Sequence, residues 1–369
     1  MTYRDRVDAP GPKRLLALDG GGIRGVLSLE VLRRLEAECR EATGNPGLVL
    51  ADVFDYIGGT STGAIIAAGL ALGQEVDHLL HLYRERSAEM FDPARLRDRV
   101  HHLYDEGPLE AILRAQSGPA TRFGSDRLKS LLMVVVRNAT TDSPWPLSNN
   151  PRARFNAVAG SAPLDLPLWQ VVRASTAAPV YFPPERMRVG GQEYLFVDGG
   201  VTGFNNPAFQ LFLMATLDRY RLCWPTGVDD LLLVSVGTGT TERDRDDLTE
   251  ADMHLGYHAA TTPIALITSS VAQQDLLCRV FGRCLCGPTI DDEVGDLIDS
   301  APLGDRNLFT YVRYDTPLDR RGLDRLGLYD VEPDAVGAID AVDHIDDLSR
   351  AGRALADRVV DVDHVAPFL

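Results

Sequence analysis

Short apolar runs alternate with longer stretches of helical periodicity along most of the chain. Each run is four to six residues long, and most are followed by glycine or another turn residue, as is typical of strands buried within a sheet. Strands that alternate with helical segments indicate an α/β fold with a mostly parallel sheet. The runs predicted as strands are residues 13–18, 53–57, 131–136, 194–197, 231–236 and 309–314.

The helical stretches begin directly after several of these runs. The first helix follows the first strand after a short glycine loop and ends at Gly44, a typical C-terminal cap residue. Two stretches are predicted as connections: residues 138–154, rich in Pro, Ser and Asn, as a mobile surface segment, and the acidic residues 240–252 as a loop. The other predicted helices are residues 64–72, 76–90, 169–178 and 263–280, with amphipathic segments at 335–344 and 348–362.

A serine stands at the corner between the second strand and the helix that follows it. Gly59-Thr60-Ser61-Thr62-Gly63 is a G-x-S-x-G pattern, which holds a serine on a tight strand-to-helix turn with its hydroxyl exposed. Gly59 and Gly63 leave room for the strained backbone, and the helix directs its positive end at any anion that forms on the oxygen. The pattern also occurs by chance, so Ser61 is a candidate nucleophile only through its context.

The first strand ends in a glycine loop, Asp19-Gly20-Gly21-Gly22-Ile23-Arg24-Gly25. The loop fits G-x-G-x-x-G, but the second strand ends without the carboxylate that would hold a ribose, and the Gly-Lys-Ser/Thr of a P-loop is absent. Unobstructed backbone N–H groups at a helix N-terminus stabilise negative charge. For acyl transfer the loop would therefore supply an oxyanion hole. The candidate residues are Gly20, Gly21, Gly22, Ile23, Arg24 and Gly25.

A carboxylate follows the strand predicted at 194–197, in Asp198-Gly199-Gly200. We expect this strand to be parallel to its neighbours, so that its carboxyl end lies at the sheet edge where α/β enzymes place catalytic groups. An ordinary Asp-Gly turn explains the same residues, so Asp198 becomes a candidate only together with Ser61.

The composition is that of an ordinary globular protein, with 45% hydrophobic and 24% charged residues. We expect one domain over residues 1–369. The formal net charge of −16, without a local basic patch, argues against a nucleic-acid polymer as partner. The N-terminus lacks the apolar core of a secretory signal, and no apolar run reaches the ~20 residues of a membrane span. Any membrane contact is therefore predicted to be peripheral and transient.

Five cysteines form an odd set without disulfide-like spacing, which fits a reduced, cytoplasmic setting. Those within residues 278–286 lack the paired spacing of a zinc site. The acidic residues at 291–296 are interpreted as a solvated face rather than a calcium loop. The sequence thus predicts no cofactor and no metal, and an activity that survives EDTA.

Taken together, the motifs resemble those of bacterial patatin-like phospholipases. The resemblance rests on the loop at 19–25, the serine turn at 59–63 and the aspartate motif at 198–200, in this order. It spans about residues 13–240, and the chain after 240 has no visible counterpart. Three further segments share in it: Ala174-Ser175-Thr176-Ala177-Ala178-Pro179, Asn205-Asn206-Pro207 and Ser235-Val236-Gly237-Thr238-Gly239.

The resemblance implies a three-layer α/β/α sandwich, similar to the catalytic domain of cytosolic phospholipases A2, and hydrolysis of lipid esters by a Ser-Asp dyad. Ser61 would form an acyl-enzyme, and Asp198 would accept the serine proton directly. Because a carboxylate near its usual pKa of about 3.9 is a weak base, the dyad requires burial to raise the pKa of Asp198. The N–H groups of Gly21, Gly22 and Ile23 would hold the oxyanion. The next residue of the loop, an arginine, would lock it or meet a lipid phosphate.

Three alternatives remain at this stage. A Ser-His-Asp hydrolase would take its histidine after the acid, with His254 and His258 as candidates, although surface positions on a helix explain both residues equally well. A general carboxylesterase would share the nucleophile. A non-enzymatic lipid-binding regulatory module would require a broken catalytic part, and none is visible.

The resemblance also implies a glycerophospholipid or membrane surface as substrate. Some bacterial members degrade membranes as effectors after a nucleotide signal, so a small-molecule nucleotide is a candidate activator; self-association is left open. An acidic chain is repelled by anionic bilayers. Apolar side chains around the pocket must therefore make the contact, and Trp145, Tyr181 and Phe182 are the candidates.

Overall fold

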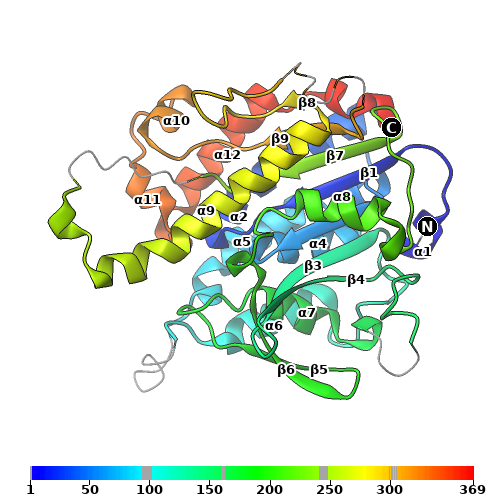
Figure 1. The fold of residues 1–369 in the computed structure, drawn as a ribbon, viewed down its shortest axis with the longest axis horizontal. Helices are drawn as coiled ribbons and strands as arrows, with labels where there is room; N and C mark the ends of the chain where they lie inside the picture. The colour runs from blue at the N-terminus through cyan, green and yellow to red at the C-terminus, as the bar shows by residue number, and fades with distance from the viewer. Residues whose placement is uncertain are drawn as a thin grey trace.

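The computed structural model describes residues 2–93, 102–158, 163–240, 248–298, 300, 302, 304 and 306–369. Within them, one nine-stranded sheet runs in the order β5-β6-β3-β2-β1-β7-β9-β8, with β4 paired to β3 outside this path (Figure 1). The strands are β1 (Lys13–Leu18), β2 (Tyr56–Thr60), β3 (Leu131–Asn138), β4 (Ser143–Ser148), β5 (Glu185–Val189), β6 (Gln192–Asp198), β7 (Leu231–Val236), β8 (Arg283–Cys286) and β9 (Thr310–Tyr314).

Parallel pairing dominates the sheet, as the alternation of strands and helices predicted. β1 pairs in parallel with β2 and β7, β3 follows β2, and β9 and β8 follow β7. β4, β5 and β6 run antiparallel to their neighbours. All six residues of β7 are buried, because a parallel sheet is covered by helices on both faces.

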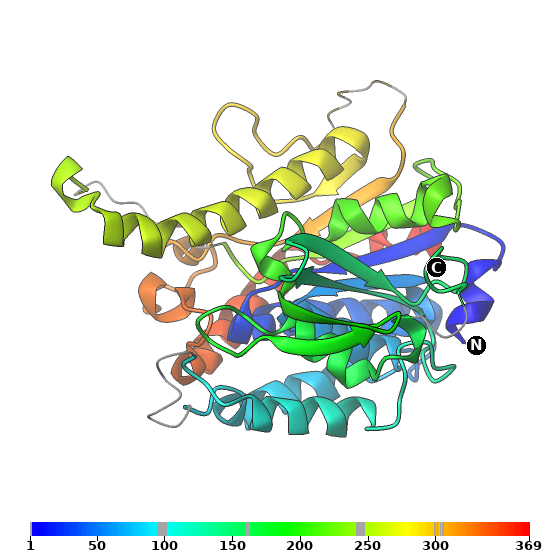
Figure 2. The ribbon, with the colours of Figure 1, turned by 60° about the horizontal axis from the view of Figure 1, so that its bottom comes forward.

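Helices lie on both faces of the sheet and give the expected three layers (Figure 1, Figure 2). α8 and α9 lie on one face, and α2, α4, α5 and α12 lie on the other. The helices are α1 (Tyr3–Val7), α2 (Gly25–Thr43), α3 (Leu50–Val53), α4 (Thr62–Ala71), α5 (Val76–Met90), α6 (Glu106–Ser117), α7 (Leu168–Ser175), α8 (Ala208–Thr216), α9 (Leu255–Phe281), α10 (Arg320–Arg325), α11 (Pro333–Gly337) and α12 (Ile345–Val359).

The second strand begins three residues later than predicted, at Tyr56. The residues before it form the short helix α3, in which the side chain of Asp52 accepts the N–H of Val49 at 3.2 Å. The glycine pair before the serine turn therefore lies inside β2. A Cβ on Gly59 would lie 2.1 Å from the carbonyl oxygen of Gly63, so the strand must be free of side chains where α4 turns back over it.

Residues 138–154 are not the mobile connection that their composition predicts. Ser143–Ser148 forms β4, which pairs with residues 133–138 of β3. β4 has no strand on its other side among the described residues. Pro144 and Pro146 are two positions apart, so the N–H groups that they lack would both face outward from this edge, where proline is tolerated.

Among the elements that were not predicted are α6, β5 and β8. β5 and β6 form a hairpin whose two-residue turn, Gly190-Gly191, has φ values of 60° and 82°. Two glycines between extended runs are a hairpin signal, and they could have identified β5. α9 begins at Leu255 and includes Pro263, where the sequence placed its start. The predicted acidic loop falls largely on residues 241–247, which lie outside the described residues.

Candidate active site

Ser61 occupies the turn between β2 and α4. Its backbone has a φ of 55° and a ψ of −123°, a conformation that residues other than glycine rarely adopt. Gly63 makes the close approach of the chain possible, because a Cβ there would lie 2.2 Å from the carbonyl oxygen of Leu18. α4 begins at Thr62, so the helix N-terminus lies directly beside the serine. This is the strained turn that the G-x-S-x-G pattern predicts.

The strand register brings Asp198 next to this turn. β2 ends with Thr60 opposite Val135 of β3, and β6 ends with Asp198 opposite Val136. β4 pairs with the same stretch of β3 and takes its other edge, so β2 and β6 share one edge. They approach along it from opposite directions, and their carboxyl ends meet. The prediction that Asp198 ends a parallel strand is wrong, because β6 runs antiparallel to β3.

The side chains of Ser61 and Asp198 are hydrogen-bonded. The serine hydroxyl donates to Oδ2 of Asp198 at 2.6 Å, and Oδ1 accepts the N–H of Gly200 at 2.7 Å. Asp198 is only 4% exposed. Burial raises the pKa of its carboxyl to about 6, against the opposing effects of these hydrogen bonds and of the charge of Arg173. The carboxylate is thus ionised at neutral pH and more basic than an exposed one.

Ser175, the last residue of α7, fixes the backbone of the serine turn. Its Oγ accepts the N–H of Ser61 at 2.9 Å and donates to the carbonyl oxygen of Val135 at 2.6 Å. The carbonyl oxygen of Ala177 accepts the N–H of Asp198 at 2.9 Å. The segment after α7 therefore holds both Ser61 and Asp198 in place beside β3.

The glycine loop between β1 and α2 is anchored at Gly20. The N–H of Gly20 donates to the carbonyl oxygen of Asn205 at 3.1 Å. Its own carbonyl oxygen accepts from the Asn205 side chain at 3.3 Å and from the Thr238 hydroxyl at 3.0 Å. A Cβ on Gly21 would lie 2.2 Å from that hydroxyl oxygen, so a side chain there would displace Thr238. Asn205 and Thr238 belong to two further segments that resemble the family, and both segments hold the glycine loop in place.

A second anchor occupies the other end of the loop. The N–H of Ile23 donates to the carbonyl oxygen of Ile339 at 2.8 Å, so this group is not available to an oxyanion. A Cβ on Gly22 would lie 2.0 Å from the same carbonyl oxygen. Within the part of the chain that the structure describes, the N–H groups of Gly21 and Gly22 have no hydrogen-bond partner. These two are the remaining candidate oxyanion donors.

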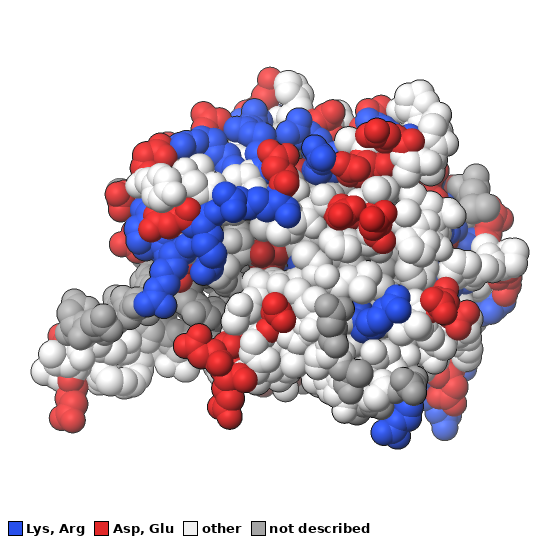
Figure 3. Space-filling view, turned by 90° about the horizontal axis from the view of Figure 1, so that it is seen from above, with Lys and Arg blue, Asp and Glu red and all other residues white. Residues whose placement is uncertain are grey.

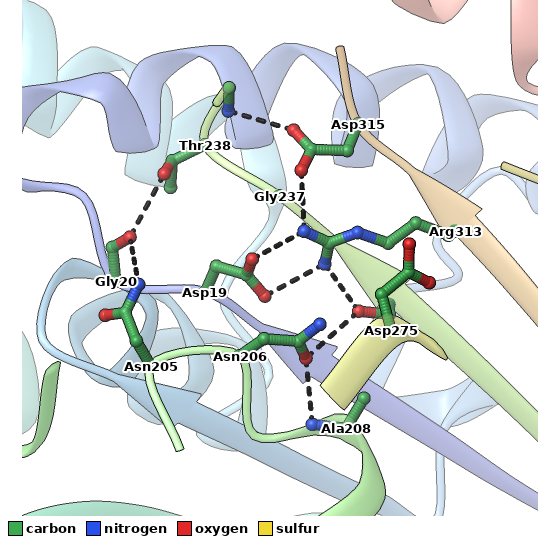
Figure 4. A network of polar contacts seen from close by, with 12 residues as sticks. Asp19, Gly20, Asn205, Asn206, Ala208, Gly237, Thr238, Asp275, Arg313 and Asp315 are labelled. Carbon is green, nitrogen blue, oxygen red and sulfur yellow. Dashed lines mark hydrogen bonds and ion pairs between the residues drawn. The ribbon is translucent and has the colours of Figure 1, made fainter. Parts of the chain in front are cut away.

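A buried cluster of ion pairs joins the start of the loop to β9 (Figure 4). The guanidinium of Arg313 donates to the two carboxylate oxygens of Asp19 at 3.0 and 2.6 Å, and to Asp315 at 2.6 Å. It also donates to the hydroxyl of Ser235 at 2.7 Å. Burial raises the pKa of Asp19, although the charge of Arg313 opposes this rise. Asp19 directly precedes the first glycine, so the cluster fixes the position at which the loop leaves the sheet.

Replacing Arg313 with methionine should lower the free energy of unfolding by about 3 to 5 kcal/mol, because it leaves two buried carboxylates without their cation. Denaturant unfolding measures this change. Arg350→Met is the matched control, since its pairs with Asp330 and Asp347 are on the surface, where water and salt screen them, and contribute little to stability. Equal losses in the two variants would contradict the role of the cluster.

Part of α9 borders the glycine loop. A pocket of about 40 Å³ is lined by Gly20 and Arg24 on the loop side and by Ile267 and Val271 of α9, among others. Nε of Arg24 donates to the carbonyl oxygen of Gly21 at 3.3 Å, as expected for a residue that locks the loop. Its Nη1 is buried and has no partner among the described residues.

The histidines considered for a triad lie elsewhere. His254 caps the N-terminus of α9, where its Nδ1 accepts the N–H of Tyr257 at 3.2 Å. His254 and His258 are both exposed. Across the residues that the structure describes, Ser61 and Asp198 have no hydrogen bond to a histidine.

The three aromatic residues expected at a lipid-facing pocket mouth are largely packed against other rings. Phe182 is 8% exposed, so the prediction that it inserts into lipid is wrong. Tyr181 stacks on Tyr104, with ring centres 6.1 Å apart. Trp145 packs edge-on against Phe196 at 5.5 Å. Trp145 and Tyr181 are partly exposed, so these two remain candidates for contact with lipid.

The sequence did not predict that Ser175 would hold the serine turn, or that Arg313 and Ile339 would hold the glycine loop. A charged residue in the middle of a predicted buried strand is a signal that could have drawn attention to Arg313. Ser175 had a weaker signal, as a small polar residue at a helix end. Ile339 had none, because it acts through its backbone carbonyl.

Comparison with known proteins agrees with this geometry. The family model for patatin-like phospholipase matches residues 16–212. Patatin-17 of Solanum cardiophyllum is 30% identical over 246 residues, which cover 62% of this chain and 60% of that protein. A cGAMP-activated phospholipase of Vibrio cholerae is 30% identical over 237 residues, covering 61% and 64%.

A third relative, calcium-independent phospholipase A2-gamma of Rattus norvegicus, is 30% identical over 289 residues, covering 74% of this chain and 34% of that protein. The chain matches about three fifths of the length of the first two relatives. The family model covers more than half of the chain and contains the serine turn, the glycine loop and Asp198. The chain belongs to the patatin-like phospholipase family.

Proposed function

We propose that the chain is a lipid acyl hydrolase that releases fatty acids from glycerophospholipids through a Ser61–Asp198 dyad. The observation that carries the proposal is the 2.6 Å hydrogen bond between a serine on a strained turn and a buried carboxylate. The two free N–H groups of the glycine loop support it, since acyl transfer needs donors for the oxyanion.

In the acylation step, Oγ of Ser61 attacks the ester carbonyl carbon while its proton passes to Oδ2 of Asp198. The carbonyl oxygen becomes an oxyanion that the N–H groups of Gly21 and Gly22 stabilise, together with the positive N-terminal end of α4. The tetrahedral intermediate collapses when the bond to the leaving alcohol breaks, and that oxygen takes the proton from Asp198. The acyl group is then esterified to Ser61.

Deacylation uses the same groups in reverse. Asp198 accepts a proton from a water molecule, whose oxygen attacks the acyl carbon, and then returns that proton to Oγ of Ser61. The hydrogen bond from Gly200 to Oδ1 keeps the carboxylate oriented, so that Oδ2 faces the serine in both steps. A single buried carboxylate thus serves as base and acid without a histidine.

The relatives favour a phospholipid substrate, because two of those compared are named as phospholipases. One of them is named as cGAMP-activated, which makes a cyclic nucleotide a candidate activator of this chain. We further propose transient, peripheral association with the membrane that contains the substrate, and a role as a regulated membrane-degrading effector.

Lipid mass spectrometry tests this function. Vesicles and mixed micelles of zwitterionic or anionic glycerophospholipid are incubated with wild-type protein or Ser61→Ala, with and without cyclic dinucleotides. We expect free fatty acid from both lipid classes with the wild type only, and cleavage of short p-nitrophenyl esters. Cleavage of soluble esters with all phospholipid left intact, whatever the nucleotide, would instead indicate a general carboxylesterase.

A further inference from the structure

The N-terminal half of α9 and the two residues before it form an exposed arm over residues 253–267. Figure 1 and Figure 2 show it extending past the edge of the sheet, whereas the C-terminal half of α9 lies against the sheet and α8. Large apolar side chains on the arm are exposed to an unusual degree. Their exposed fractions are 46% for Met253, 86% for Leu255, 56% for Ile264 and 66% for Leu266.

The arm also lacks charge. Residues 253–274 contain no Asp, Glu, Lys or Arg, although 24% of the chain is charged, so that about five would be expected in a stretch of this length. Figure 3 shows the arm as mostly uncharged surface beside a body that carries many charged side chains. With a net charge of −16, few parts of the protein can approach an anionic surface without repulsion.

One stretch of the arm is exposed on all sides of the helix. Residues 262–266 are all exposed, and five consecutive residues cover more than a full turn of 3.6 residues. A helix that docks on another protein buries one stripe and keeps polar side chains on the opposite face. The five exposed residues carry no charge on any side of the helix, so they can enter the apolar layer beneath lipid head groups without burying a charge.

The arm leads directly to the candidate active site. Ile267, at its end, and Val271, one turn further, line the pocket that also contains Gly20 and Arg24. A lipid held at the arm therefore lies close to the glycine loop. No helix of the described residues is both long enough and apolar enough to cross a membrane.

We propose that the α9 arm inserts into the surface of a glycerophospholipid bilayer and holds the active site against it. The identity of the lipid rests on the proposed function, whereas the insertion itself does not. Apolar burial rather than charge provides the attachment, so binding should occur on zwitterionic lipid and persist at high salt.

Co-sedimentation with phosphatidylcholine vesicles tests the proposal. Binding is measured in the Ser61→Ala background, so that the lipid stays intact. We expect Leu255→Glu with Leu266→Glu to weaken binding at least tenfold. The control Tyr329→Glu places the same charge at a residue that is 74% exposed in another part of the molecule, and should bind like the parent. With Ser61 present, the ratio of vesicle to soluble-ester turnover should fall at least tenfold in the arm variant only.

The outcomes separate this proposal from the proposed function. Equal vesicle binding by the arm variant and its parent would overturn the proposal. So would a parent that binds no vesicles and forms a dimer in analytical ultracentrifugation that the arm variant dissociates, because a second copy would then cover the arm. Arm-dependent binding without any phospholipid cleavage would support the arm and reject the proposed function.

Discussion

Replacing Ser61 with alanine should reduce ester turnover by at least about 10⁴-fold and abolish labelling by a fluorophosphonate probe. Ser61 combines the strained turn, the N-terminus of α4, the carboxylate of Asp198 and the facing glycine loop. The substitution removes the attacking oxygen and leaves the turn otherwise unchanged. Gel fluorescence with the probe and a p-nitrophenyl ester assay measure the two effects.

Ser175→Ala is the matched control, because Ser175 is a buried serine that is hydrogen-bonded to the backbone of Ser61. Its hydroxyl proton is used in the hydrogen bond to the Val135 carbonyl, and its oxygen accepts the Ser61 N–H. It is therefore not activated as a nucleophile. This variant should label more slowly but still label. Labelling that survives in Ser61→Ala and disappears in Ser175→Ala would overturn the assignment.

Replacing Asp198 with asparagine should reduce turnover by about 10² to 10⁴-fold, the usual range for loss of a general base. The wild-type rate should rise with pH and level off above an apparent pKa of about 6, because only the ionised carboxylate accepts the serine proton. The variant should lose this dependence. Rates of a soluble ester between pH 4.5 and 8 measure both effects.

His254→Ala and His258→Ala are the comparison for this prediction. Both histidines are exposed residues at the start of α9, and neither should alter the turnover of a soluble ester beyond about twofold. A histidine variant as damaging as Asp198→Asn would replace the dyad with a triad.

The stability of the Asp198 variant follows from the same pKa. The folded-state pKa of about 6 lies above the ordinary value of 3.8, so ionisation of Asp198 opposes folding. The free energy of unfolding therefore falls as the pH rises from about 4 to 6, and the full loss is reached above pH 6. Asp198→Asn removes it, and at pH 8 should raise the free energy of unfolding by on the order of 1 to 3 kcal/mol. Its loss of activity would then not come from unfolding.

The parts of the site that the sequence predicted are those that depend on local geometry. The turn at Ser61 needs glycine at 59 and 63 because backbone atoms come within 2.3 Å of where their side chains would begin. The glycine loop is recognisable for a similar reason, because side chains at Gly21 and Gly22 would collide with Thr238 and with the carbonyl oxygen of Ile339. Such close contacts restrict the residue type directly, so the restriction is visible in the sequence.

Strand direction is less visible. The run at 194–197 was expected to be parallel to its neighbours, like the other strands of an α/β sheet, but β6 enters the sheet from a hairpin and runs the opposite way. Asp198 still reaches the serine, because β6 pairs only with the last three residues of β3. The contact between Asp198 and Ser61 therefore forms although β6 does not have the direction on which the prediction relied.

The contacts that the sequence did not predict join residues that are far apart in the chain. Arg313 pairs with a residue 294 positions earlier in the chain, and the carbonyl of Ile339 reaches the loop from the same C-terminal region. No local pattern connects such positions. Residues after 240, which the motifs do not include, hold the glycine loop at both ends and supply the exposed arm.

The central claim is that Ser61 carries the acyl group, and trapping the acyl-enzyme tests it most directly. Wild-type protein is mixed with an oleoyl ester substrate, quenched with acid within the first turnovers and mapped by peptide mass spectrometry. We expect an oleoyl adduct on the peptide that contains Ser61, and no adduct in Ser61→Ala. An oleoyl group on a different residue, or sustained turnover with no acylated peptide at any quench time, would contradict it.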